Sequence, residues 1–144
     1  MEHFPEFVAN HLFLFSLLLA ITTLLLWNLF GDTVSGIRLI IPMELTRLIN
    51  HENAIVVDLR KQDEFNNGHI LNSKNVPVDQ FSDREKELET YKTRTVILCC
   101  NMGNDSPRIA RILNQKGFEN VYCLKGGIQS WRSASLPLNR DNES

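Results

Sequence analysis

The sequence has few cysteines and little net charge, and each shortage excludes a class of protein. Its 144 residues contain three cysteines and carry a formal net charge of −2. Cys99 and Cys100 are neighbours, and a disulfide between neighbours would be strained, so the chain does not have the disulfide framework of a small secreted domain. Free thiols instead fit a reducing compartment. The near-neutral charge gives no electrostatic support for binding nucleic acid, and we expect none among the partners.

Metal ligands are sparse as well. The four histidines (His3, His11, His51 and His69) are scattered along the chain. None of them forms the spacing with cysteine that is typical of a zinc site. The sequence therefore predicts neither a metal nor another cofactor.

The first 35 residues lack Lys and Arg and contain a long uncharged run. A helix over residues 12–30 would span roughly 28 Å at about 1.5 Å per residue, close to the hydrocarbon thickness of a bilayer. A cleaved signal peptide, the first alternative, needs a basic start and a small-residue cleavage site. The run ends instead with Trp27 and Phe30, which suit a membrane interface. A buried core helix is the second alternative, and the sequence favours a transmembrane helix.

The flanking charges predict the orientation and the domain boundaries. Arg38 and Arg47 follow the run, and the positive-inside rule then places the following domain in the cytoplasm, in agreement with its free thiols. We expect a single-pass protein with these parts: an N-terminal flank at 1–11, a transmembrane helix at 12–30, a tether at 31–36, one domain at 37–138 and a polar tail at 139–144.

The domain alternates short apolar runs with helical patterns. Strands are predicted at 37–41, 54–58, 75–77, 95–100 and 120–124, and helices at 42–50, 63–68, 83–91, 107–116 and 128–131. Such alternation indicates βαβ units, hence an α/β fold with a parallel sheet covered on both faces. The run at 95–100 is the most apolar and is predicted to be the central strand.

Cys100 ends this central run and is followed by a glycine-containing loop. Ligands of parallel sheets bind at the carboxyl ends of the strands. Ser106 suits a helix N-cap and Pro107 a first helical residue. Loop N–H groups and a helix N-terminus both stabilise a thiolate or an anionic adduct on its sulfur. We therefore predict a reactive Cys100, whereas Cys99 and Cys123 lie inside apolar strands and are predicted to be inert.

Three ordered motifs over residues 37–138 resemble the rhodanese (sulfurtransferase homology) family. They are Val57-Asp58-Leu59-Arg60 with Glu64-Phe65, Gly68-His69-Ile70, Ser73 and Asn75-Val76-Pro77; Cys100 with Gly103 and Ser106; and Gly117-Phe118, Asn120-Val121-Tyr122, Leu124, Gly126-Gly127 and Trp131. The resemblance implies a three-layer rhodanese-like fold around a central, mainly parallel five-stranded sheet. With its apolar N-terminal run, the chain resembles the membrane-tethered rhodaneses of the bacterial inner membrane.

The resemblance also implies a sulfurtransferase, although the active-site loop departs from the family. Cys100 would take the outer sulfur of a donor such as thiosulfate and pass it, from a persulfide, to cyanide, a small thiol or a protein thiol. Asp58 and Arg60 would support the site. The implied substrate-binding residues are Asn101, Met102, Gly103, Asn104, Asp105 and Ser106. The loop is short, as is typical of sulfur chemistry, and Ser106 stands where related phosphatases have arginine.

Asn101 and Asp105 occupy positions where active rhodaneses often carry arginine. A carboxylate near Cys100 would raise the pKa of its thiol and repel thiosulfate. The helix N-terminus favours the anion by only about 0.3–1 kcal/mol at an exposed site, so Asp105 could cancel its effect. Two functions therefore stay open: a weak or specialised sulfurtransferase, or a catalytically weak or inactive interaction module that docks a membrane-protein or cytosolic partner.

Overall fold

The computed structural model describes the backbone of residues 7, 10–34 and 36–141 and the side chains of all of these except 29–34. The chain divides into two units, Met1–Gly36 and Ile37–Ser144, which we describe separately. The predicted flank (1–11), tether (31–36) and tail (139–144) lie partly outside the described residues, as does the side chain of Phe30.

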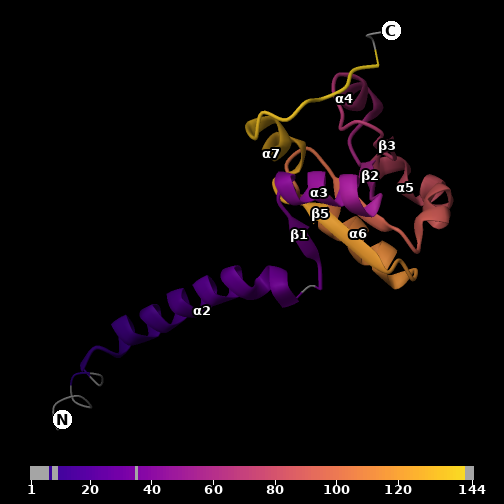
Figure 1. Ribbon diagram of the computed structural model, residues 1–144. Coiled ribbons are helices and arrows are strands. Elements are labelled where there is room, and N and C mark those ends of the chain that lie inside the picture. The colour runs from indigo at the N-terminus through magenta and orange to yellow at the C-terminus, as the bar shows by residue number, and fades with distance from the viewer. Residues whose placement is uncertain (1–6, 8–9, 35, 142–144) are drawn as a thin grey trace. The chain divides into compact units, whose positions relative to one another are not determined.

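The first unit contains helix α2, Leu12–Val34 (Figure 1). The hydroxyl groups of Ser16, Thr22 and Thr23 bond back to carbonyls of the preceding turn, for example Thr22 to Leu18 at 2.8 Å, so the helix satisfies these three groups itself. Large apolar side chains, including Phe13 and Trp27, are exposed along it. Among the described residues, however, no helix has the length and apolarity needed to cross a membrane, and the predicted transmembrane segment at 12–30 is not supported.

The second unit is built on a five-stranded parallel sheet, as predicted (Figure 1). Its strands are β1 (Arg38–Ile40), β2 (Ile55–Asp58), β3 (Lys74–Asn75), β4 (Thr95–Cys99) and β5 (Asn120–Leu124). Their order across the sheet is β1-β5-β4-β2-β3, with β4 in the middle. All five residues of β4 are buried, because helices cover both faces of a parallel sheet.

Alternate residues of β4 face two different cores. Ile97 and Cys99 pack with α3 (Pro42–Glu52) and α7 (Gly127–Ser133). Val96, Leu98 and Cys100 pack on the other face, with α6 (Ser106–Gln115) and the buried side chains Phe81 and Leu88. Cys100 therefore belongs to the core face that α6 covers, whereas Cys99 belongs to the opposite one.

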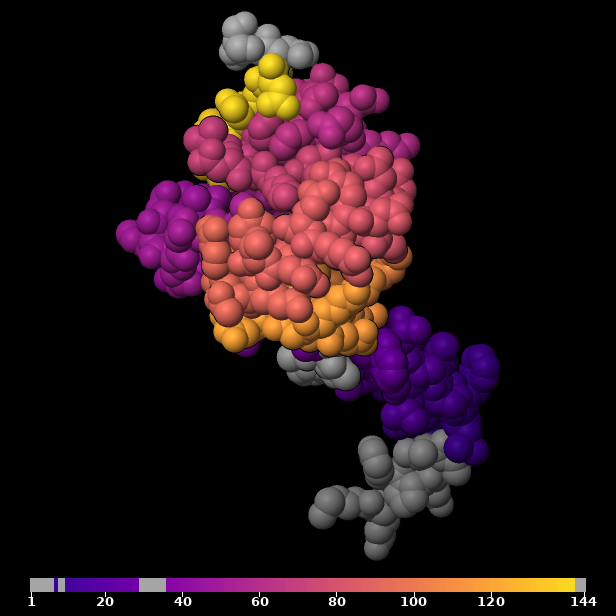
Figure 2. All heavy atoms as spheres, turned by 90° about the vertical axis from the view of Figure 1, so that its right-hand side faces the viewer, coloured from indigo at the N-terminus to yellow at the C-terminus, as the bar shows by residue number. Residues whose placement is uncertain are grey.

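The segment predicted as one helix at 83–91 is different in the structure. It consists of a short α-helix, α5 (Phe81–Arg84), and a 3₁₀ helix, η2 (Glu85–Tyr91). Side chains at i and i+3 align in a 3₁₀ helix, and Arg84 here bonds to Glu87 at 2.8 Å. Lys116, which directly follows α6, pairs with Glu85, and Figure 2 shows α6 (orange) against this segment (pink).

A buried ion pair fixes the chain where β2 ends. Asp58 is fully buried, and its carboxylate accepts bonds from the Arg60 backbone N–H at 3.0 Å and from Arg60 Nη2 at 2.7 Å. Arg60 Nη2 also donates to the carbonyl of Gly68 at 2.7 Å. Burial alone would lower the pKa of the guanidinium, but the bonds to Asp58 reverse this and raise it. Arg60 thus stays charged, and its bonds tie β2 to the segment that follows α4 (Gln62–Asn66).

Removing one member of this pair should destabilise the domain strongly. We expect Arg60→Ala to lower the free energy of unfolding by about 3–5 kcal/mol, because it leaves the Asp58 carboxylate buried without a counter-charge. Urea unfolding of the purified protein measures this loss. Arg84→Ala is the matched control, since it breaks the solvent-exposed pair with Glu87 and should cost far less. Equal losses in the two variants would contradict a structural role for the buried pair.

Candidate active site

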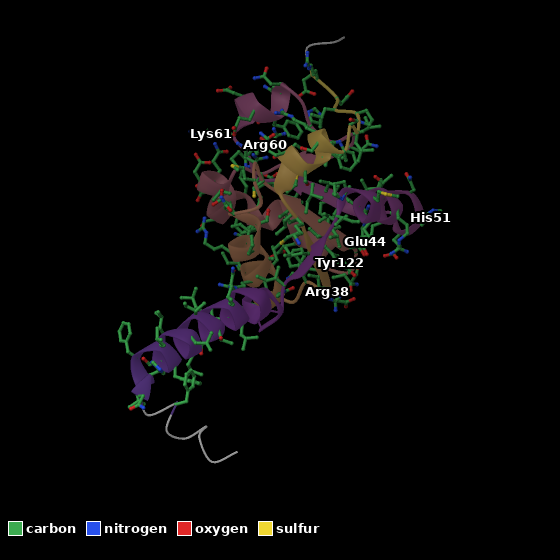
Figure 3. All side chains as sticks on the ribbon, turned by 90° about the vertical axis from the view of Figure 1, so that its left-hand side faces the viewer. Arg38, Glu44, His51, Arg60, Lys61 and Tyr122 are labelled. Carbon is green, nitrogen blue, oxygen red and sulfur yellow. The ribbon has the colours of Figure 1, made fainter. Side chains whose placement is uncertain are left out.

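A pocket of about 470 Å³ lies where β2 and β4 end. Such positions, at the carboxyl ends of parallel strands, are where α/β sheets bind ligands. The pocket is lined by Leu59, Arg60, Lys61, Glu64, Val78, Asp79, Cys100, Asn101, Asp105 and Arg108. Figure 3 shows Arg60 and Lys61 at this end of the sheet, away from Arg38 and Tyr122. Cys100 is the one cysteine that lines it.

The loop after β4 provides a hydrogen bond to the Cys100 sulfur. The backbone N–H of Gly103 donates to Cys100 Sγ at 3.0 Å. Gly103 has φ +89°, a left-handed conformation that favours glycine. A hydrogen bond to the charged form of a group stabilises that form. This contact therefore favours a thiolate, or a persulfide anion, on Cys100.

Helix α7 holds the same loop from the other side. The N–H of Ile128 donates to the carbonyl of Cys100 at 2.8 Å, and the N–H of Gln129 donates to the carbonyl of Asn101 at 3.2 Å. Gly127 has φ +60°, and a Cβ on it would lie 2.2 Å from the Cys100 carbonyl oxygen. In the sequence, Gly126-Gly127 is identified only as part of the third family motif. The role of Gly127 in positioning the Cys100 loop depends on contacts between segments that are distant in the chain. No local sequence pattern indicates such contacts.

The other two cysteines have environments that suppress reactivity. Burial raises the pKa of Cys99 well above its ordinary value, and the nearby charge of Asp58 adds to the effect. Burial also raises the pKa of Cys123 to about 12, with a smaller contribution from Cys100. Both thiols stay protonated near neutral pH, and thiols are poor nucleophiles compared with thiolates. This agrees with the prediction that Cys99 and Cys123 are inert.

The structure places the predicted substrate-binding residues in different environments. Asn101 and Asp105 line the pocket, while Met102 and Asn104 are exposed and do not. Ser106 is fully buried, and its hydroxyl has no hydrogen-bond partner among the described residues. The predicted N-cap role of Ser106 is wrong, because α6 begins at Ser106 itself and Asp105 holds the cap position without a side-chain bond. A binding role for these residues stays a prediction.

Four charged pocket residues were not among the candidate site residues. Lys61, Glu64, Asp79 and Arg108 come from three separate segments that the fold brings together. Glu64 belongs to the first family motif, but the other three have the appearance of ordinary surface charges in the sequence, so no pattern could reveal them. With Arg60 and Asp105 they give the pocket three basic and three acidic side chains.

Comparisons with known proteins agree with this arrangement. The Rhodanese-like domain family matches residues 42–134. The chain is 36% identical to the Escherichia coli (strain K12) protein YibN over 97% of this chain and 99% of that one. It is 35% identical to thiosulfate sulfurtransferase GlpE of Pseudomonas fluorescens, over 65% of this chain and 84% of that one. A rhodanese-related protein from Thermoplasma volcanium superposes with a TM-score of 0.64 at 31% identity, covering 71% of this chain and 97% of that one.

A methyl group at Gly127 should displace the nucleophile loop. We expect Gly127→Ala to lower the free energy of unfolding by about 1–3 kcal/mol more than its control, because the new Cβ would overlap the Cys100 carbonyl. It should also change the rate at which iodoacetamide alkylates Cys100.

Gly117→Ala is the matched control for this substitution. Gly117 has φ +90° but no atom within 4 Å of an added Cβ, so its substitution tests backbone strain alone. Urea unfolding and peptide mass spectrometry measure the two effects. Equal stability losses and equal alkylation rates would show that the contact of Gly127 with the loop is unimportant.

Proposed function

The chain belongs to the rhodanese-like domain family, and we propose that it is a sulfurtransferase that carries sulfane sulfur as a persulfide on Cys100. The observation that carries the proposal is the Cys100 sulfur, which lines a pocket at the end of β4 and accepts the Gly103 N–H at 3.0 Å. A relative that bears the name thiosulfate sulfurtransferase supports the same reaction class.

The proposed reaction has two nucleophilic steps. The Cys100 thiolate attacks the outer sulfur of the donor, the sulfur–sulfur bond of the donor breaks, and sulfite leaves with the bonding electrons when the donor is thiosulfate. An acceptor thiolate, or cyanide, then attacks the outer sulfur of the persulfide and returns Cys100 to the thiolate. Each step exchanges one bond to sulfur for another, and the enzyme needs no metal or redox cofactor. The Gly103 N–H stabilises the Sγ thiolate that begins the first step and is restored by the second.

Thiosulfate itself is proposed to be a poor donor. Asp105 and Asp79 face the pocket, and Arg60 is already neutralised by Asp58 at 2.7 Å. A dianion that enters this pocket meets repulsion as well as attraction. The same observation favours a second candidate function, in which the domain docks a partner and has little catalytic activity.

We further propose that α2 attaches the domain to the bacterial inner membrane, with the domain in the cytoplasm. Support comes from the exposed apolar side chains of α2, such as Leu19 and Leu24. Exposed apolar patches of this kind mark surfaces that bind a membrane or another protein. The basic residues Arg38 and Arg47 follow α2, and no basic residue precedes it. A membrane protein is then a reasonable class of partner for the domain.

The enzyme proposal is tested by thiosulfate:cyanide turnover of the purified chain. We expect weak thiocyanate formation and a mass gain of one sulfur atom on the peptide that contains Cys100, both of which should be lost in Cys100→Ser. Asp105→Arg should raise kcat/KM several-fold, because it replaces a repulsive charge at the pocket with an attractive one.

Asn104→Arg is the matched control, since Asn104 is exposed in the same loop but does not line the pocket. It should leave turnover nearly unchanged. Background rates in every variant, with no mass gain on Cys100, would exclude the sulfurtransferase and favour the docking module.

Membrane attachment is tested by fractionating bacterial cells that express the full chain. We expect it in the membrane fraction, with a C-terminal reporter active in the cytoplasm. The double variant Leu19→Lys, Leu24→Lys should release it, because two charges on the exposed apolar surface of α2 disfavour burial of that surface among lipid chains. The control Leu71→Lys, at an exposed site of the domain, should leave the protein in the membrane fraction. Recovery of the unaltered chain in the soluble fraction would refute the attachment.

A further inference from the structure

We infer that the acceptor of the Cys100 sulfur is a small thiol that carries both an ammonium and a carboxylate group, an inference that rests on the proposed function. It follows from the pocket that surrounds Cys100, which presents free charges of both signs. The chemical class is that of an amino-acid thiol, the simplest example being cysteine.

The free cations of the pocket are Lys61 and Arg108. Lys61 precedes α4, and Arg108 lies in the first turn of α6. No salt bridge engages either side chain within the part of the chain that the structure describes. Arg60, the third cation, is buried and committed to Asp58 and to the carbonyl of Gly68. Two positive groups are therefore available to a ligand carboxylate.

The free anions are Asp79 and Asp105. Asp79 belongs to the 3₁₀ helix η1 (Val78–Gln80), and Asp105 closes the Cys100 loop. Neither carboxylate is in a salt bridge with another described residue. Glu64 is less available, because its carboxylate accepts the Lys61 backbone N–H at 3.3 Å. An ammonium group near Cys100 thus has two carboxylates to pair with.

This balance selects a zwitterion over a simple anion. A dianion gains from Lys61 and Arg108 about what it loses to Asp79 and Asp105, whereas a thiol with both charges can pair with both sets. The pocket, at about 470 Å³, is in the range of small-molecule sites. Cys100 is only 2% exposed, so a cysteine on the flat surface of a protein reaches its sulfur less easily than a small thiol does.

The transfer step is balanced without any further reactant. The acceptor thiolate attacks the outer sulfur of the Cys100 persulfide and forms a new sulfur–sulfur bond. The bond between that sulfur and Cys100 Sγ breaks, and its electron pair remains on Sγ as the thiolate. The acceptor leaves as a persulfide, and its ammonium and carboxylate groups keep their protonation states throughout.

The test uses the full chain. Excess thiosulfate or polysulfide first loads sulfur onto Cys100, and the unreacted donor is then removed. Loss of the persulfide is followed by mass spectrometry with four thiols at equal thiolate concentration: cysteine, cysteamine, 3-mercaptopropionate and 2-mercaptoethanol. We expect cysteine to react fastest, and each missing charge to slow the transfer roughly two- to fivefold, as for exposed ion pairs.

Charge-removing variants separate the pocket from the intrinsic reactivity of each thiol. The double variant Asp79→Asn, Asp105→Asn should abolish the higher transfer rate of the thiols that carry an ammonium group. The double variant Lys61→Gln, Arg108→Gln should abolish the higher transfer rate of the thiols that carry a carboxylate. Asp83→Asn with Lys86→Gln removes exposed charges outside the pocket and should preserve the order of the four thiols.

The outcomes distinguish this inference from the function on which it rests. A persulfide that forms on Cys100 but passes to all four thiols at rates that the pocket variants do not change would overturn the inference and leave the sulfurtransferase intact. Faster transfer to a surface cysteine of an unrelated folded protein than to free cysteine would also overturn it. Absence of any persulfide on Cys100 overturns the proposed function and this inference together.

Discussion

The buried pair of Asp58 and Arg60 is the interaction on which the site depends. It lies at the end of β2, and its guanidinium reaches the carbonyl of Gly68. Asn75 of β3 donates to the carbonyls of Asp58 and Arg60 at 3.0 and 2.9 Å, so the edge strand is held by the same two residues. The pair thereby sets the path of the chain that carries Lys61 and Glu64 to the pocket. Burial is the main cause of the raised pKa of Cys99, the charge of Asp58 adds to it and that of Arg60 partly offsets it.

Local sequence patterns could predict the sheet and the nucleophile, because each depends on neighbours in the chain. The apolar runs at 54–58, 95–100 and 120–124 correspond to β2, β4 and β5, and the burial of β4 matches its central place in the sheet. The remaining pocket residues could not be predicted in this way. Lys61, Asp79 and Arg108 meet only because parallel strands end at one edge of the sheet, and the division of 83–91 into two helix types depends on tertiary packing of Leu88.

Family membership establishes the fold more firmly than the substrate. The match over residues 42–134 covers strands β2 to β5, the Cys100 loop and Gly126-Gly127 at the start of α7. Asn101 and Asp105, however, belong to a loop that carries one carboxylate and no basic side chain. The proposed persulfide chemistry requires a nucleophile and an N–H donor to its sulfur, and Cys100 and Gly103 provide them. In that proposal the charge around them decides which donors and acceptors reach the sulfur, and in this pocket the charge is mixed.

The close contact between Gly127 and the Cys100 carbonyl has a consequence for local unfolding. The loop that carries Cys100 is anchored by backbone N–H groups of Ile128 and Gln129, which belong to the short helix α7. The geometry around the Cys100 sulfur is therefore set only while α7 is docked. Local opening of this one helix would release the loop even if the rest of the sheet stayed folded.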